Sequence, residues 1–104
     1  MTTFDDRESA FETKYAHDAD LKFRVEARRN KLVGLWAAGL LGKTGQEAAD
    51  YAMTVVQADF AEAGKEDVVR KLAADLGARA TPEAIRAKMA ELLAVAKSQL
   101  MDEQ

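Results

Sequence analysis

Apolar residues recur through most of the chain at steps of three, four and seven, the spacing of one face of an α-helix. In the first such run the apolar positions are Leu21, Val25, Leu32, Leu35, Trp36 and Leu40. The run ends at about Leu41, because the glycine that follows, Gly42, is typical of a helix C-terminus. The pattern therefore predicts a long first helix that turns this face toward a core.

Three further helices are predicted after it. Thr44-Gly45-Gln46-Glu47 fits a capping box at the start of the second, and Thr81-Pro82-Glu83 opens the fourth. Gly64 and Gly77 end the second and third. The expected inward faces are Ala48, Ala52, Val55, Val56, Phe60 and Ala63; Val68, Val69, Leu72, Ala73 and Leu76; and Ile85, Met89, Leu92, Leu93, Ala96 and Leu100. No window alternates as a strand does, so we expect an all-α protein with a compact four-helix bundle over residues 21–104.

Residues 1–20 differ from the rest of the chain. Their only large apolar side chains are Phe4, Phe11 and Tyr15, which bury too little surface to offset the entropy lost on ordering. We therefore expect a mobile or transiently helical N-terminal segment beside the bundle.

If this segment is helical, Phe4, Glu8, Phe11 and Tyr15 form one stripe, with steps of four, three and four. Such a stripe fits either a helix laid into a partner's groove or a helix packed on its own bundle. The sparse apolar content and the change of charge near Leu21 favour the docking segment.

Composition and charge narrow the functional classes. The chain has 104 residues, which suits one domain, and no cysteine, so disulfides and thiolate sites are excluded. It has neither a signal-like apolar run nor a membrane-spanning one, so the cytoplasm is the default compartment. The net charge is −3, which gives no support to nucleic-acid binding. The charge is uneven: residues 1–20 have a balance of −4 and residues 21–43 of +5.

Gly42-Lys43-Thr44 matches the last three residues of a phosphate-binding P-loop. A full P-loop has an earlier glycine, where this chain has Ala37, and it follows a buried strand rather than a helix. We therefore interpret Gly42 and Thr44 as caps of successive helices. An alternative stays open, because amides at a helix N-terminus can hold a phosphate. Lys43 and Thr44 would then bind ATP or ADP weakly in a small ligand-sensing module, and we expect no other cofactor.

The remaining candidate chemistry is sparse. His17 is the only histidine, so neither a metal site nor a histidine-activated nucleophile has support, and we expect no enzyme. Arg24, Arg28 and Lys31 share one helical face. That face is either solvated or an electrostatic guide toward an acidic partner or the chain's own acidic head.

Several matched stretches, in order, carry a family resemblance: Phe4-Asp5-Asp6-Arg7-Glu8, Glu26-Ala27-Arg28-Arg29-Asn30-Lys31-Leu32, Leu35-Trp36-Ala37-Ala38, Leu41-Gly42-Lys43-Thr44-Gly45, Ala58-Asp59-Phe60 with Ala63-Gly64, and Glu66-Asp67-Val68. Over nearly all its length the chain resembles the ATPase inhibitor zeta subunit of alphaproteobacterial F-type ATP synthases. The resemblance implies a four-helix fold and a role as an inhibitor of ATP hydrolysis by the synthase's catalytic head. We expect the protein to be monomeric when free. The resemblance also implies a cytoplasmic protein, peripheral on the inner-membrane ATP synthase and not itself inserted in the membrane.

The resemblance further implies that the N-terminal region is the inhibitory element, entering the interface of the alpha and beta subunits near the gamma shaft. The positions that carry over are Phe4, Asp5, Asp6, Arg7, Glu8, Phe11 and Tyr15. We expect Phe4, Phe11 and Tyr15 to anchor in apolar pockets. Arg7, Glu8 and Lys14 would set register and orientation through polar pairs.

Overall fold

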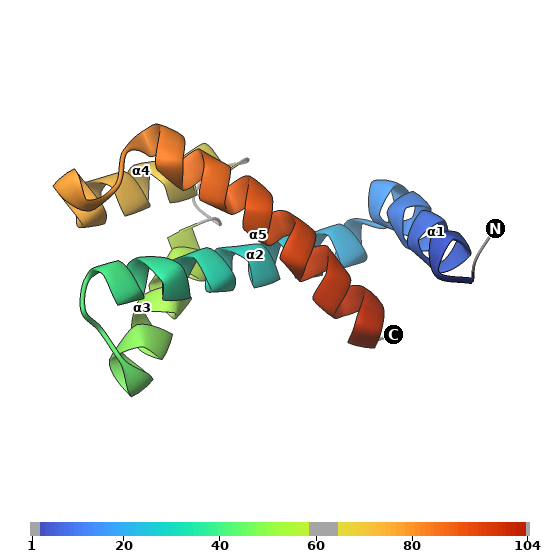
Figure 1. Cartoon of the computed structure of the whole chain (residues 1–104), viewed down its shortest axis with the longest axis horizontal. Coiled ribbons are helices and arrows are strands. Elements are labelled where there is room, and N and C mark those ends of the chain that lie inside the picture. The colour runs from blue at the N-terminus through green and yellow to red at the C-terminus, as the bar shows by residue number, and fades with distance from the viewer. Residues whose placement is uncertain (1–2, 59–64, 104) are drawn as a thin grey trace.

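The computed structural model describes residues 3–58 and 65–103, apart from the side chains of residues 3–5. This part of the chain is helical, with the order α1 (Thr3–His17), α2 (Ala19–Leu40), α3 (Gly45–Ala58), α4 (Glu66–Leu76), a short 3₁₀ turn (Gly77–Arg79) and α5 (Pro82–Glu103). The molecule is elongated, with extents of 46 × 27 × 24 Å. The two long helices α2 and α5 cross, α4 lies at one end, and α1 lies at the other (Figure 1).

The all-α prediction is confirmed, but the count of four helices is not. The described residues form five α-helices. The four expected helices correspond to α2 through α5, and α1 is an additional helix in the segment predicted to be mobile. That mobility stays a prediction.

Several helix boundaries follow the predicted capping signals. Thr81 Oγ1 accepts a hydrogen bond from the Ala84 amide at 3.1 Å, which confirms the predicted start of α5. Gly77 ends α4 with φ of 55°, a conformation that L side chains rarely adopt. The predicted stop at Gly64, and the inward positions Phe60 and Ala63, lie outside the described residues.

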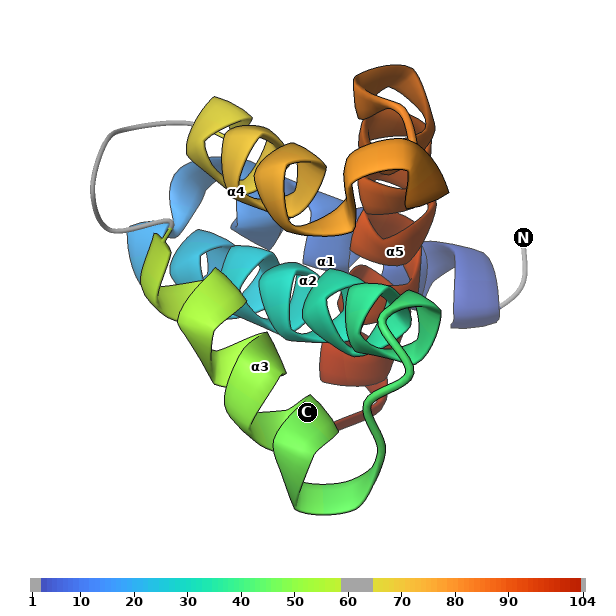
Figure 2. The same ribbon diagram turned by 90° about the vertical axis from the view of Figure 1, so that its left-hand side faces the viewer.

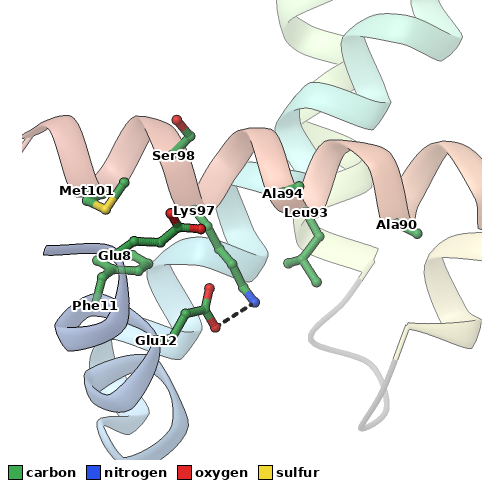
Figure 3. A pocket seen from close by; sticks show the side chains of 9 residues that line it. All are labelled: Glu8, Phe11, Glu12, Ala90, Leu93, Ala94, Lys97, Ser98 and Met101. Carbon is green, nitrogen blue, oxygen red and sulfur yellow. Dashed lines mark hydrogen bonds and ion pairs between the residues drawn. The ribbon is translucent and has the colours of Figure 1, made fainter. Parts of the chain in front are cut away.

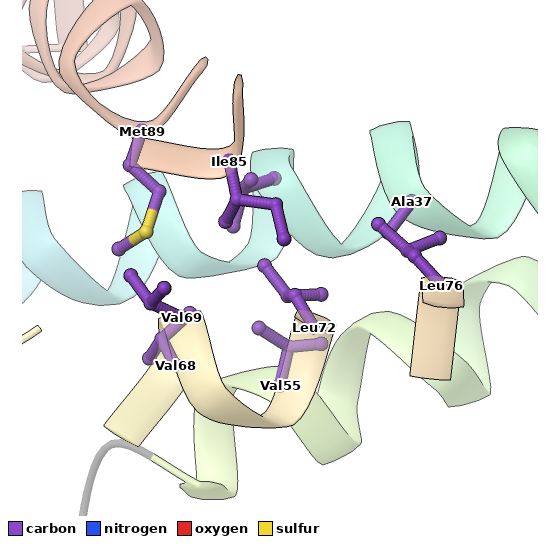
Figure 4. Close-up of a cluster of buried hydrophobic side chains, with 9 residues drawn as sticks. Ala37, Val55, Val68, Val69, Leu72, Leu76, Ile85 and Met89 are labelled. Carbon is purple, nitrogen blue, oxygen red and sulfur yellow. The ribbon is translucent and has the colours of Figure 1, made fainter. Parts of the chain in front are cut away.

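The main core is an apolar cluster to which α2, α3, α4 and α5 all contribute (Figure 4). Its buried members are Val33, Ala37, Val55, Val68, Val69, Leu72, Leu76, Ile85 and Met89. The faces predicted for α4 and α5 are confirmed at Val68, Val69, Leu72, Leu76, Ile85, Met89, Ala96 and Leu100. This cluster stabilises the bundle mainly by removing apolar surface from water.

The face predicted for α2 is partly wrong. Leu21 and Val25 are buried, whereas Leu35 and Leu40 remain 38% and 41% exposed. The other buried positions of α2 are Arg29, Asn30, Val33, Gly34, Ala37 and Ala38. The cause is that α2 packs on two helices at once, α3 and α5, as Figure 2 shows with α2 at the centre.

Small residues on α2 allow this double contact. A Cβ on Gly34 would lie 2.7 Å from the Cα of Ala52, so the backbones of α2 and α3 meet at this point. The bulky Leu35 is therefore turned away from the interface. Hydrophobicity alone could not predict this choice, because the packing distance depends on the partner helix.

Candidate functional site on helix α1

Helix α1 contacts the rest of the molecule through one buried aromatic side chain. Phe11 is only 5% exposed and joins a second apolar cluster with Leu21 and Val25 of α2 and with Ala96, Leu100 and Met101 of α5. In Figure 3, Phe11 and Glu8 of α1 face the part of α5 that carries Lys97 and Met101. Burying a side chain of this size contributes about 1.5–3 kcal/mol. We call this contact region, with the α5 residues Lys97, Met101 and Asp102, the α1 seat.

Two basic side chains tie the edges of the α1 seat. Lys97 Nζ lies 3.3 Å from Glu12 Oε2 and 4.3 Å from the centre of the Tyr15 ring. Arg7 Nη2 donates to the Met101 carbonyl at 2.7 Å and lies 3.3 Å from the Asp102 carboxylate. Both carboxylates are more than half exposed, so each ion pair is worth about 0–1 kcal/mol. The polar contacts therefore set the position of α1 more than they secure it.

Tyr15 closes the seat at the end of α1. The ring is half-buried against the second apolar cluster. Burial raises the pKa of its hydroxyl, and the nearby negative charge of Glu26 raises the pKa further, while Arg29 opposes both. Tyr15 therefore stays neutral at ordinary pH, with Lys97 over its face as a cation–π contact.

A single extended residue separates α1 from α2. Asp18 has φ of −104° and ψ of 106°, and its carboxylate accepts from the amides of Asp20 and Leu21 at 3.0 and 3.2 Å. Asp18 is therefore the N-cap of α2. The break between the two helices lies here, and the division of the chain into an N-terminal segment, residues 1–20, and a bundle stays a prediction.

Open grooves flank Phe11 on both sides. One of about 360 Å³ is lined in part by Glu8, Glu12, Leu93 and Lys97 (Figure 3). The other, of about 320 Å³, is lined by Arg7, Ala10, Phe11, Lys14 and Met101. Helix α1 thus touches the body along one ridge and leaves space on either side. This is looser packing than the main core shows.

The predicted inhibitory residues divide between two sides of α1. Arg7, Glu8, Phe11 and Tyr15 are turned toward the body and line or contact the α1 seat. Asp6 is exposed, and Lys14 is exposed beside the second groove. Phe4 and Asp5 lie within α1, but their side chains are outside the described residues. Of the three predicted aromatic anchors, therefore, Phe11 is buried and Tyr15 half-buried against the protein's own bundle.

Comparison with known proteins decides the family. The family model for ATPase inhibitor subunit zeta matches residues 1–99. The chain belongs to the ATPase inhibitor subunit zeta family. A protein with a structure solved by solution NMR is 57% identical in sequence to this zeta-family chain, and the two structures superpose with a TM-score of 0.75. The match covers 81% of this chain and 99% of the other chain. None of the curated proteins matches the chain.

Membership in the zeta family makes this protein an ATPase inhibitor, a regulatory subunit rather than a catalyst. It also implies an interaction with the F-type ATP synthase. The family name does not specify the subunits contacted or the inhibitory residues.

Sequence reasoning missed the α5 half of the α1 seat in this zeta subunit. Lys97, Met101 and Asp102 were not predicted to contact the N-terminal segment. A signal was present, because Leu93, Lys97 and Met101 recur at steps of four and place a lysine within an apolar stripe. A lysine stem can cover apolar surface while its charged end finds a carboxylate or a ring.

The Gly-Lys-Thr triplet of this zeta subunit ends α2. Gly42 has φ of 78°, its amide donates to the Gly39 carbonyl at 3.1 Å, and the Lys43 amide donates to Ala38 at 2.9 Å. These two bonds make a Schellman motif. The prediction that Gly42 caps a helix is confirmed. Because both amides serve α2, they are not free for a phosphate, and nucleotide binding at Lys43 and Thr44 stays a prediction.

The basic face of α2 is largely paired within the protein. Arg28 donates to Glu103 at 2.8 Å and to Gln99 at 3.0 Å, and Arg24 pairs with Asp20 at 3.1 Å. The pKa of Glu103 is lowered chiefly by its hydrogen bond from Arg28. The role of this face as a guide for an acidic partner stays a prediction.

The described part of the chain contains neither a cluster of metal-ligating side chains nor a membrane-spanning helix. In residues 3–58 and 65–103, no three histidine or carboxylate side chains gather where they could hold a metal ion. Within the same described part of the chain, no helix has the length and apolar character needed to cross a membrane.

Proposed function

We propose that this zeta-family protein inhibits ATP hydrolysis by inserting α1 as a wedge into the catalytic head of the F-type ATP synthase. The site would be an interface between alpha and beta subunits near gamma, reached from the cytoplasmic side where the head projects. The main support for this proposal is that α1 lies at one end of the molecule and contributes no residue to the main core. It could leave its seat while the bundle behind it stays folded.

The residue pattern of α1 supports this assignment. Its stripe combines aromatic groups, which are efficient interface anchors, with charged groups at the edges. Phe11 and Tyr15 lie on this stripe together with Glu8. A partner that replaced the α1 seat would have to offer an apolar pocket for Phe11 and counter-charges for Arg7 and Glu12.

The proposed mechanism follows from rotary catalysis. A rotary ATPase hydrolyses ATP only while its catalytic interfaces open and close in turn. A helix bound in one interface adds its binding free energy to the barrier for reopening. Any segment that becomes ordered only on binding loses about 2–5 kcal/mol of the gross interaction. The bundle would act as a stop that limits how far α1 enters.

Deletion of residues 2–16 tests the proposal. The truncated protein should keep the helical circular dichroism of α2–α5 but lose inhibition of ATP hydrolysis by the isolated catalytic head. Retained inhibition at the original concentration would refute α1 as the inhibitory element.

A point variant refines this test. Phe4→Ala removes an aromatic group from the predicted stripe and should weaken inhibition without unfolding the bundle. The matched control is Phe23→Ala on α2, whose side chain is 53% exposed and outside the α1 seat. If both variants lose inhibition equally, the effect is not specific to α1.

A further inference from the structure

The face of α1 that would enter the catalytic head is the face that this structure buries against its own body. Phe11 fills the apolar part of the α1 seat, and Arg7 contacts Met101 and Asp102 at its edge. One helix face cannot be covered by α5 and by the head at the same time. Binding to the head therefore requires α1 to leave the seat.

We infer that α5 competes with the ATP synthase for α1, and that Lys97 and Asp102 set the inhibitor's potency from outside the inhibitory helix. This inference rests on the proposed function of α1. It assigns a regulatory role to the last two turns of α5, which the sequence analysis did not connect with inhibition.

Lys97 is the centre of this contact. Its Nζ reaches Glu12 at 3.3 Å and lies 4.3 Å from the centre of the Tyr15 ring, so one side chain holds two positions one turn apart on α1. Its side chain is 24% exposed, against 51% for Glu12. Lys97 is therefore the more buried partner, and its loss removes both contacts at once.

Arg7 holds the other end of α1. It donates to the Met101 carbonyl at 2.7 Å, a group that becomes free of helical bonds as α5 ends. The neighbouring Asp102 carboxylate lies 3.3 Å from the same guanidinium nitrogen. The α1 seat thus has a charged contact at each end and Phe11 between them.

The size of these contacts suits a reversible latch. The apparent dissociation constant of a partner rises as the fraction of open protein falls, in inverse proportion. Exposed ion pairs and cation–π contacts are individually weak, so a latch built from them stays within reach of a competing interface. An α1 buried as deeply as the main core could not be released in this way.

Variants on α5 test the inference without altering α1. Lys97→Gln removes both contacts with Glu12 and Tyr15, and Asp102→Asn removes the charge opposite Arg7. The concentration for half-maximal inhibition of the isolated head should fall about three- to tenfold for Lys97→Gln and about twofold for Asp102→Asn. An unchanged or higher value for Lys97→Gln would overturn the inference.

The chain supplies a matched control for each variant. Lys88 on α5 also pairs with a carboxylate, Glu91, and lies over an aromatic ring, Trp36, but it does not contact α1. Glu103 lies beside Asp102 but pairs with Arg28 of α2. Lys88→Gln and Glu103→Gln should leave potency within about twofold of the original protein. Gains equal to those of Lys97→Gln would indicate general loosening and overturn the latch.

A reversible crosslink tests the closed state. Glu12→Cys with Lys97→Cys gives two thiols in a chain that otherwise has no cysteine. A short bis-methanethiosulfonate reagent should join them within one molecule and abolish inhibition, and a reducing agent should restore the inhibition that the unlinked double variant shows before crosslinking. Failure to form the intramolecular link, or full inhibition by the linked protein, would overturn the inference.

The results separate this inference from the proposed function. If deletion of residues 2–16 leaves inhibition intact, the proposed function fails, and the latch as a control of potency fails with it. If the deletion abolishes inhibition while the α5 variants and the crosslink leave it unchanged, α1 is the wedge and only the latch fails.

Discussion

The main core of the bundle and the α1 seat hold helices together in different ways. The main core is formed by aliphatic side chains of four helices, nearly all fully buried. The seat has one deeply buried aromatic, Phe11, with ion pairs at its edges and grooves beside it. We therefore expect the first arrangement to lose stability when any one helix leaves it, and the second to open at α1 alone.

This difference matters for the proposed function, in which an inhibitor that inserts one helix into a rotary ATPase needs both properties. Helix α1, which would enter the enzyme, would have to leave the α1 seat with only a small loss of free energy. The bundle of α2–α5, which stays outside, would have to remain folded while the rotary ATPase exerts force on the inserted helix. The contrast between the two regions can be tested by perturbing each with changes of similar chemistry.

The largest effect is expected in the main core. Leu72 is fully buried between the helices of the bundle. Leu72→Ala should lower the free energy of unfolding by about 2–5 kcal/mol, because it removes buried methyl groups and leaves a cavity. Denaturant unfolding followed by circular dichroism measures this change. A loss below about 1 kcal/mol would show that the core is less tightly packed than its burial indicates.

The α2–α3 contact should respond next most strongly. A Cβ at Gly34 would meet the Ala52 backbone at 2.7 Å, so Gly34→Ala should destabilise the protein by about 1–3 kcal/mol. Gly39, on the same helix, has nothing within 4 Å of its Cβ position. Gly39→Ala should therefore be neutral or stabilise by up to about 1 kcal/mol. Equal effects in thermal unfolding would argue against the close approach.

Phe11→Ala is the most direct test of whether α1 can undock while the bundle stays folded. Replacing a buried phenylalanine with alanine normally lowers the free energy of unfolding by about 3–5 kcal/mol. Here we expect a global loss of only about 1 kcal/mol or less, because α1 can undock before the bundle unfolds. Amide hydrogen exchange should accelerate in residues 6–17 and stay slow in α4 and α5. If exchange accelerates throughout, α1 is an integral part of the core.

Local signals were sufficient to predict much of the bundle. The threonine cap of α5, the glycine stops at Gly42 and Gly77 and the buried faces of α4 and α5 depend on neighbours within a few residues. Such features are encoded in short windows of sequence. The all-α class followed from the same periodicity.

The candidate site was harder to predict because its parts are distant in the chain. Phe11 was correctly singled out, but its contacts with Leu100 and Met101 join opposite ends of the sequence. Likewise, Leu35 is exposed because the small residues beside it admit α3. Periodicity shows that a residue has an apolar face, but the partner of that face is decided by the whole packing arrangement.

The smallest effect concerns the polar joint between α3 and α4, which contrasts with the polar edges of the α1 seat. Asp75 accepts from the Tyr51 hydroxyl at 2.7 Å and from Lys71 at 2.9 Å. Burial acts to raise the pKa of Asp75, but the hydrogen bonds from Lys71 and Tyr51 prevail and lower it below 3.8. The pKa of Tyr51 is raised above 10.0, first by burial and then by its bond to Asp75.

The lowered pKa of Asp75 and the raised pKa of Tyr51 act at opposite ends of the pH dependence of stability. A lowered carboxyl pKa means that the unfolded chain binds more protons in acid, so the contribution of Asp75 is present above pH 3.8 and is lost as pH falls through the lowered pKa. A raised phenol pKa means that the contribution of Tyr51 is present below pH 10.0 and is lost as pH rises through the raised pKa. Denaturant midpoints measured across about pH 2.5–11 should therefore fall at both the acid and the alkaline end of this range. Tyr51→Phe should flatten the alkaline limb and weaken the acid one, while exchange in α1 stays unchanged. If Tyr51→Phe also frees α1, the bundle and the seat are coupled, and the independence of the two regions would have to be given up.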